Sequence, residues 1–210
     1  MISFDEQVLQ HVRLPLALAA LFLCLVGWSA CGPKDYGVWW MEMVWVLGVF
    51  GLLSVTYRRF RFSNASYSIV FIWLALHTIG AHYTFELVPM DWLKELLGTT
   101  RNHYDRIAHF AIGLNSYMLA ELFLRKRWVS GRVTASVFAV VSIVAMAGLW
   151  EIVEWIGAVW DGGDAGLAFL GSQGDVWDAQ KDILADTIGA VCAAFCFCFC
   201  RSMVVKVGEE

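Results

Sequence analysis

Residues 133–150 read VTASVFAVVSIVAMAGLW, a run that holds no Asp, Glu, Lys or Arg. A helix of about 20 mostly apolar residues crosses the hydrocarbon core of a bilayer. Similar runs recur along the chain, and the predicted spans are residues 14–31, 38–57, 67–83, 107–124, 133–152 and 182–200. Continuous apolar runs favour helices, because membrane-spanning strands alternate apolar and polar residues. The sequence therefore predicts an all-α polytopic membrane protein, with one domain over residues 1–210 built as a bundle of six transmembrane helices.

The composition agrees with lipid as the solvent for most of the chain. Of the 210 residues, 59% are hydrophobic and 16% are charged. Soluble domains average about half apolar and about a quarter charged residues. A chain of this length cannot bury so much apolar surface in a core of its own. The composition therefore excludes a soluble enzyme, a nucleic-acid-binding protein and a disordered chain.

The basic residues predict the orientation. Ten of the fifteen Lys and Arg residues fall on the side that six crossings assign to both termini: Arg13, Arg58, Arg59, Arg61, Arg125, Lys126, Arg127, Arg132, Arg201 and Lys206. Segments rich in Lys and Arg stay in the cytoplasm, so both termini are predicted to be cytoplasmic. Fourteen of the nineteen acidic residues fall at or near the opposite, outer side. Tryptophans that fit an outer aromatic belt are Trp28, Trp39, Trp40, Trp92, Trp160 and Trp177.

Ionisable residues gather at the outer ends of the last four predicted spans. They are His77 and His82, then Asp105 and His109, then Glu151 and Glu154, and finally Asp175, Asp178, Asp182 and Asp186. Steps of three or four residues place side chains on one face of a helix. A charged side chain that faces lipid costs about 2.5–3.5 kcal/mol. We therefore expect these residues to point inward, toward a shared polar pocket near the outer surface.

Converging carboxylates repel one another unless they share protons, pair with basic residues or bind a cation. Arg101, Arg106 and Lys181 are too few to neutralise this group. Carboxylates with imidazole suit zinc, manganese or iron, and carboxylates alone suit magnesium or calcium. The pattern thus predicts a divalent metal (Zn, Mn or Mg) with the ligands His109, Glu151, Glu154 and Asp182, and with Asp105 and Asp186 as catalytic groups that orient the ligands.

A structural role explains part of the same pattern. Acids near a helix N-terminus cap free amides and oppose the helix dipole, which suits Asp105 and Asp182. Glu151 and Glu154 do not fit this explanation, because they fall near the predicted C-terminal end of their helix, where the dipole disfavours acids.

Five glycines lie between Gly162 and Gly174, in the segment that precedes the last span. Glycine allows tight turns and lets backbone amides approach a ligand. The segment is either a plain turn-rich loop or a lid over the polar pocket. The residues predicted to contact a substrate or form that lid are His77, His82, Gln173, Asp175 and Asp178. The sequence leaves open whether residues 153–175 continue the fifth helix, re-enter the membrane or form the lid.

Three stretches resemble a known family: YDRIAHF at residues 104–110, WEIVEW at 150–155 and LGSQGDVWDAQKD at 170–182. They are similar to the YjdF family of bacterial inner-membrane proteins, which carries a domain of unknown function. This resemblance implies a multi-pass protein of the bacterial inner (plasma) membrane. Asp105 with His109, the Glu pair, and the segment from Asp186 to Gly189 are also similar to VanZ-like membrane proteins, which are linked to glycopeptide-antibiotic tolerance.

Three functions fit these observations. The first is a metal-dependent enzyme that acts on a lipid or lipid-linked substrate reaching the site from the membrane. The second is an ion-coupled transporter, since intramembrane carboxylates and histidines also mark ion pathways. The third is a non-catalytic membrane scaffold whose acids bind a protein or cation. Membrane lipids are the expected surroundings and nucleic acid is not an expected partner. The substrate, the reaction, the metal and the oligomeric state stay undetermined.

Overall fold

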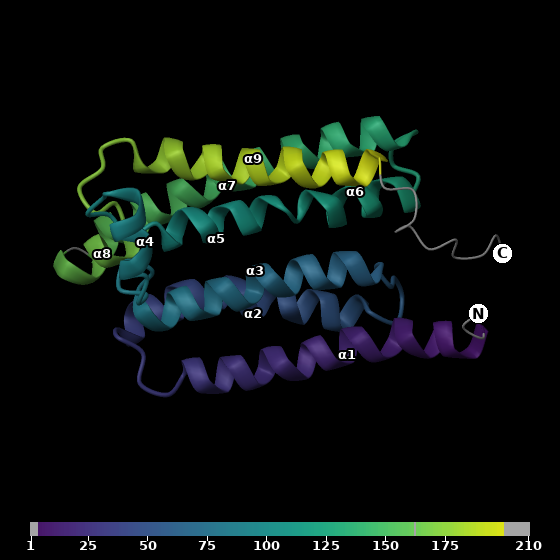
Figure 1. Ribbon diagram of the computed structural model, residues 1–210, viewed down its shortest axis with the longest axis horizontal. Helices are drawn as coiled ribbons and strands as arrows, with labels where there is room; N and C mark the ends of the chain where they lie inside the picture. The colour runs from purple at the N-terminus through teal and green to yellow at the C-terminus, as the bar shows by residue number, and fades with distance from the viewer. Residues whose placement is uncertain (1–3, 162, 200–210) are drawn as a thin grey trace.

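The structure, a computed structural model, describes residues 4–161 and 163–199. Its regular elements are all helices: α1 Phe4–Ser29, α2 Tyr36–Thr56, α3 Asn64–Tyr83, α4 Asp91–Leu97, α5 Tyr104–Gly113, α6 Ser116–Arg125, α7 Arg132–Asp161, α8 Gly163–Leu170 and α9 Asp178–Phe199. The predicted all-α class is therefore confirmed. The long helices run along a common axis, and the short helices α4 and α8 lie together at one end of the bundle (Figure 1).

The structure has five segments long and apolar enough to cross a membrane: Tyr36–Thr56, Asn64–Tyr83, Tyr104–Arg125, Arg132–Trp160 and Asp178–Phe199. The apolar part of α1, Arg13–Ser29, is shorter. The start of α1 and the end of α9 lie at the same end of the bundle (Figure 1). The sixth crossing, by α1, and the cytoplasmic side of both termini stay predictions. Cys200, Arg201 and Lys206 lie outside the described residues.

The predicted orientation can be checked through Cys31, which follows α1 and is exposed. We expect a membrane-impermeant maleimide to label Cys31 in right-side-out spheroplasts, because both termini are predicted to be cytoplasmic and the α1–α2 connection then lies outside. The measurement is the mass shift of the purified protein, with Cys31→Ser as the unlabelled control. Labelling of Cys31 only after the membrane is made permeable would mean that the orientation is reversed.

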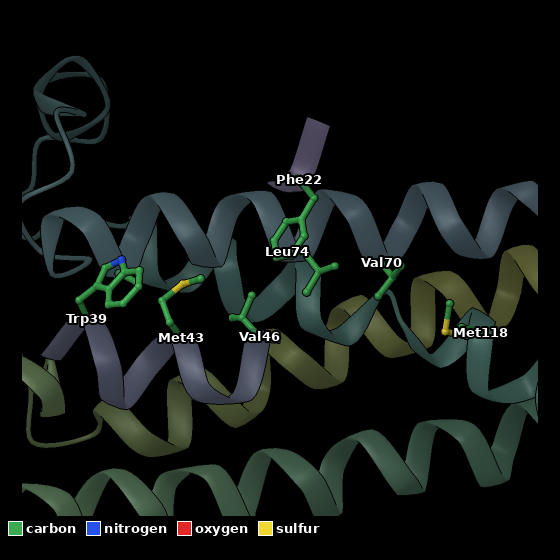
Figure 2. Close-up of a cluster of buried hydrophobic side chains, with 8 residues drawn as sticks. Phe22, Trp39, Met43, Val46, Val70, Leu74 and Met118 are labelled. Carbon is green, nitrogen blue, oxygen red and sulfur yellow. The ribbon is translucent and has the colours of Figure 1, made fainter. Parts of the chain in front are cut away.

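The first three helices pack through a buried apolar cluster. Figure 2 shows members of this cluster from four helices: Phe22 of α1, Trp39, Met43 and Val46 of α2, Val70 and Leu74 of α3, and Met118 of α6. A buried hydrogen-bond chain joins the same helices: Trp39 Nε1 donates to Ser29 Oγ at 2.8 Å, and Ser29 Oγ donates to the Thr78 carbonyl at 3.1 Å. Because lipid is as apolar as these side chains, close packing and internal hydrogen bonds must hold the helices together.

Helices α5 and α9 approach each other through glycine. A Cβ atom on Gly113 would overlap the backbone of Asp186, and one on Gly189 would overlap the carbonyl of Phe110. Gly189 and Ala193, four residues apart on α9, are both buried. Small residues let helix backbones come close together in a membrane. This close contact places the acidic residues of α9 against α5.

The fourth predicted span is not one continuous helix, because α5 ends at Gly113 and α6 begins at Ser116. The break follows the glycine that packs on the α9 backbone. The Asn115 side-chain amide donates to the carbonyls of Ala111 and Ile112, at 3.1 and 3.0 Å. The Ile112 carbonyl also accepts from the Asn115 backbone amide at 2.9 Å. The side chain thus supplies a donor to the Ala111 carbonyl at the break, as the hydrocarbon region requires.

The fifth span continues beyond its predicted end at residue 152. Helix α7 reaches Asp161, so Glu151 and Glu154 lie inside the helix and not at its end. Helix α8 then folds back against α7, where Gly157 lies against the Phe169 ring and Gly166 against the Ala158 carbonyl. The sequence left the structure of residues 153–175 open. Helix α7 continues to Asp161, the short helix α8 packs on it, and a loop from residue 171 leads to α9.

Candidate functional site

The predicted polar pocket lies at the end of the bundle that carries α4 and α8, and it is centred on His109, a buried residue of α5. Its Nδ1 atom lies 2.9 Å from Asp186 Oδ2 on α9. Its Nε2 atom faces two other carboxylates, with Asp105 Oδ1 at 3.6 Å and Asp182 Oδ1 at 3.8 Å. Helical spacing explains this convergence, because Asp105 is four residues before His109, and Asp182 is four residues before Asp186. One ring nitrogen is thus held by a carboxylate while the other faces a pair of carboxylates.

Asp105, His109 and Asp182 offer ligand atoms that all lie within 4.8 Å of one another. His109 and Asp182 are buried, and Asp105 is half-buried. One imidazole nitrogen with carboxylate oxygens is a donor set that suits zinc or manganese. Behind these ligand atoms, Asp186 contacts the far nitrogen of the same imidazole. A carboxylate in this position fixes the tautomer and ring orientation of a metal-binding histidine.

Two arginines neutralise the outer part of the acidic group. Arg106 pairs with Asp182, with Asp178 at 2.5 Å and with Asp175 at 3.7 Å. Arg101 reaches Asp178 at 2.6 Å, so that both guanidinium groups meet one carboxylate oxygen. Sequence reasoning assigned Asp175 and Asp178 to substrate binding or a lid, and Asp182 to the metal ligands. The structure joins them to Arg101 and Arg106 in an ion-pair network at the rim of the pocket.

A small cavity lies on the inner side of the site, with a volume of about 10 Å³. Its polar lining comes from four long helices: Glu42 on α2, His77 on α3, Asp105 and His109 on α5, and Glu154 on α7. Trp150 and Phe169 close it on the apolar side. A cavity of this volume holds about one water molecule. Titratable side chains from four helices therefore line a space of atomic size.

The lining of the cavity also contains a second histidine–carboxylate pair. His77 Nε2 lies 2.8 Å from Glu42 Oε2, and both residues are buried. Next to this pair, Glu154 Oε1 accepts a hydrogen bond from Trp150 Nε1 at 2.6 Å. Glu151 is half-buried, and its Oε1 atom is buried without a hydrogen-bond partner in the described part of the chain. Glu151 is absent from the residues that line the cavity.

The loop before α9 is tied down over the rim. Gln173 makes two hydrogen bonds to the backbone of Asn102, accepting from its amide at 2.9 Å and donating to its carbonyl at 3.0 Å. Arg101 Nη1 donates to the Ser172 carbonyl at 2.5 Å. A hydrogen bond from Lys181 lowers the pKa of the Asp175 carboxyl below its usual value. The loop before α9 is thus anchored to Arg101 and Asn102, which precede α5.

We expect Gln173→Ala to loosen this loop. The substitution removes both hydrogen bonds to Asn102, and each bond contributes about 0.5–1.5 kcal/mol. Amide hydrogen exchange over residues 171–177 should rise about tenfold, while exchange in α2 and α3 stays unchanged. Gln180→Ala is the matched control, because Gln180 is exposed on α9. Equal exchange in the two variants would show that Gln173 does not hold the loop.

The structure brings most of the predicted site residues together. The centre of the site consists of Asp105, His109, Asp182 and Asp186. The adjoining cavity is lined by His77 and Glu154. The rim contains Gln173, Asp175 and Asp178. His82 lies apart from them, because its Nδ1 bonds to the Ser29 carbonyl and its ring stacks on Trp28. Glu42 was missed by sequence reasoning. The available signal was its position as the one acidic residue in the apolar run Tyr36–Thr56.

Comparison with known proteins agrees with this architecture. Residues 14–202 match the family model described as "Predicted membrane protein (DUF2238)". The chain is 33% identical over 187 residues to "Inner membrane protein YjdF" of Escherichia coli (strain K12), and the alignment covers 88% of each chain. No solved structure matches significantly. Since the family model covers nearly every helix described above, this chain belongs to the DUF2238 family of membrane proteins.

Proposed function

We propose that this protein is a divalent-metal-dependent enzyme of the bacterial inner membrane, acting on a lipid or lipid-linked substrate at the outer surface. The observation that carries the proposal is the arrangement around His109. Asp186 holds one ring nitrogen, and the other faces Asp105 and Asp182. A metal ion bound between these groups would be surrounded by one nitrogen and two carboxylates. The membrane location follows the relative, which is named an inner membrane protein.

The balance of charge favours a cation over an empty acidic pocket. Buried carboxylates must be paired, protonated or bound to a metal. Arg106 shares its guanidinium among several carboxylates, so Asp182 has only part of one positive charge as a partner. A divalent ion would supply two charges at one point. A bound metal would then activate water or polarise a phosphoryl or acyl oxygen, which is the chemistry an enzyme at this site would use.

A lipid substrate is supported by the surface around the rim. Val176 and Trp177, directly before Asp178, are strongly exposed, and Trp160 at the end of α7 is nearly fully exposed. Tryptophan at a membrane protein surface prefers the level of the lipid headgroups. A site below such residues is open to molecules that diffuse within the outer leaflet. The termini are proposed to be cytoplasmic, which is consistent with this placement.

Metal content is the first test of the proposal. Protein purified in mild detergent is incubated with Mn²⁺ or Zn²⁺, separated from free metal and analysed by mass spectrometry. The wild type should retain metal, and Asp182→Asn should lose it. Glu121→Gln is the control for removing a buried carboxylate, because Glu121 pairs with Arg125 at the opposite end of the bundle. Absence of bound metal in the wild type would refute the proposal.

Turnover is the second test, and it separates an enzyme from a scaffold. The protein is incubated with a total polar lipid extract in the presence of Mn²⁺ or EDTA, and the lipids are compared by mass spectrometry. We expect a lipid species to be consumed with Mn²⁺ by the wild type and not by Asp182→Asn. Bound metal without any metal-dependent change in the extract would favour a non-catalytic cation site.

A further inference from the structure

Glu42 and Glu154 are buried carboxylates that no arginine or lysine neutralises in the part of the chain that the structure describes. Their residues keep only 3% and 8% of their surface exposed. Glu42 contacts His77, and Glu154 contacts the Trp150 indole, which carries no charge. Both line the small cavity beside His109. Two carboxylates in this setting need protons or a cation, because an isolated buried charge is unstable.

A third buried carboxylate shows how the same protein satisfies such a group without a metal. Glu121, at the opposite end of the bundle, accepts hydrogen bonds from the Ser63 amide at 2.9 Å and from the Ser63 and Ser66 hydroxyls at 2.8 and 2.6 Å. Arg125 supplies the opposite charge at 2.6 Å. Donors and a guanidinium thus surround Glu121 completely, whereas the cavity offers Glu42 and Glu154 one imidazole and one indole.

The two histidines beside the cavity are built alike. Asp186 contacts one ring nitrogen of His109, and Glu42 contacts one ring nitrogen of His77 at 2.8 Å. The remaining nitrogen of His77, Nδ1, is buried and has no hydrogen-bond partner among the described residues. A carboxylate on one imidazole nitrogen orients the other nitrogen for a metal. The free nitrogen of His77 is therefore an unused ligand atom in a residue that lines the cavity.

We propose that the cavity binds a second divalent cation, with His77 and Glu154 as its protein ligands and Glu42 as the carboxylate that orients His77. This inference rests on the proposed function, in which the first cation lies between Asp105, His109 and Asp182. Asp105 belongs to that group and also lines the cavity, so its carboxylate is placed to face both ions. Paired metal sites in enzymes hold their ions about 3.5–4 Å apart. Asp105 and His109 of the first site both line the cavity, so the two positions would be neighbours.

The test is the number of Mn²⁺ ions retained per chain after gel filtration. We expect two in the wild type, and one in both His77→Ala and Glu154→Gln. Asp182→Asn should lose the first ion. His82→Ala is the matched histidine control and should retain two ions, because His82 stacks on Trp28 away from the cavity. Glu121→Gln should also retain two, since its carboxylate is at the other end.

The outcomes separate the two proposals. One ion in the wild type, unchanged by His77→Ala, would overturn the second position and leave the first intact. No ion in the wild type would overturn both. If the His77 variant does not fold, the electron paramagnetic resonance spectrum of the Mn²⁺-loaded wild type tests whether a second ion is bound. Two neighbouring Mn²⁺ ions give a coupled signal, and an uncoupled six-line signal would refute the second position.

Discussion

Replacing His109 with alanine is expected to lower the affinity of the purified protein for Mn²⁺ or Zn²⁺ by about a hundredfold or more. The substitution removes the nitrogen that faces Asp105 and Asp182. It leaves Asp182 with Arg106, and Asp105 with Arg101 and Arg106, as charged partners. A hundredfold change corresponds to about 2.7 kcal/mol of binding free energy. The measurement is a competitive titration against a metal-sensitive dye in detergent, at constant pH and ionic strength.

The metal affinities of two further variants show whether the loss is specific to the site around His109. Asp186→Asn should weaken metal binding by about ten- to a hundredfold. The substitution changes the carboxylate that orients His109 and leaves the proposed ligands in place. Asp91→Asn, at an exposed residue of α4, should leave the affinity unchanged. If His109→Ala and Asp91→Asn bind metal equally well, the site around His109 does not hold the ion, and the proposed function fails with it.

Leucine in place of Gly189 is expected to cause a large loss of stability. A Cβ atom at this position would overlap the Phe110 carbonyl, and backbone cannot move aside as a flexible side chain can. The α5–α9 contact would open, and the carboxylates of α9 would separate from His109. The expected cost is roughly 4 kcal/mol, the size associated with severe core disruption. Thermal unfolding in detergent, followed by helical circular dichroism, measures the change.

Gly148→Leu is the matched control, because a Cβ atom on Gly148 of α7 meets nothing within 4 Å. This variant should unfold at nearly the wild-type temperature. It should also retain bound metal, whereas Gly189→Leu should lose metal and stability together. Similar unfolding temperatures for the two leucine variants would contradict the close backbone contact between α5 and α9.

Sequence reasoning worked well where a property depends on neighbours along one helix. Asp105 with His109, and Asp182 with Asp186, share helix faces because of their four-residue spacing. Their inward direction follows from the cost of exposing charge to lipid. The structure places all four in one cluster. Reasoning failed for His82, whose step of five from His77 turns it toward α1 and the Ser29 carbonyl.

The partners of each acidic residue could not be predicted. Asp178 is neutralised by Arg101 and Arg106, whereas Glu154 has only the Trp150 indole in the described part of the chain. In the sequence these residues look equivalent, since each is an acid near the outer end of a predicted span. The difference arises because Arg101, just before α5, and Arg106, in its first turn, reach the carboxylates at the start of α9. Helix α7 instead carries Glu154 to the cavity.

The amino-acid sequence by itself determined the helical class, the approximate spans and the end of the bundle where the polar site lies. These features depend on apolar length and on helical periodicity, which are local properties of the chain. Only the tertiary structure decided that Glu42 joins His77, that α5 breaks beside α9, and that a cavity separates two histidine–carboxylate pairs. Such contacts depend on which helices become neighbours, and small residues such as Gly113 and Gly189 select those neighbours through backbone fit.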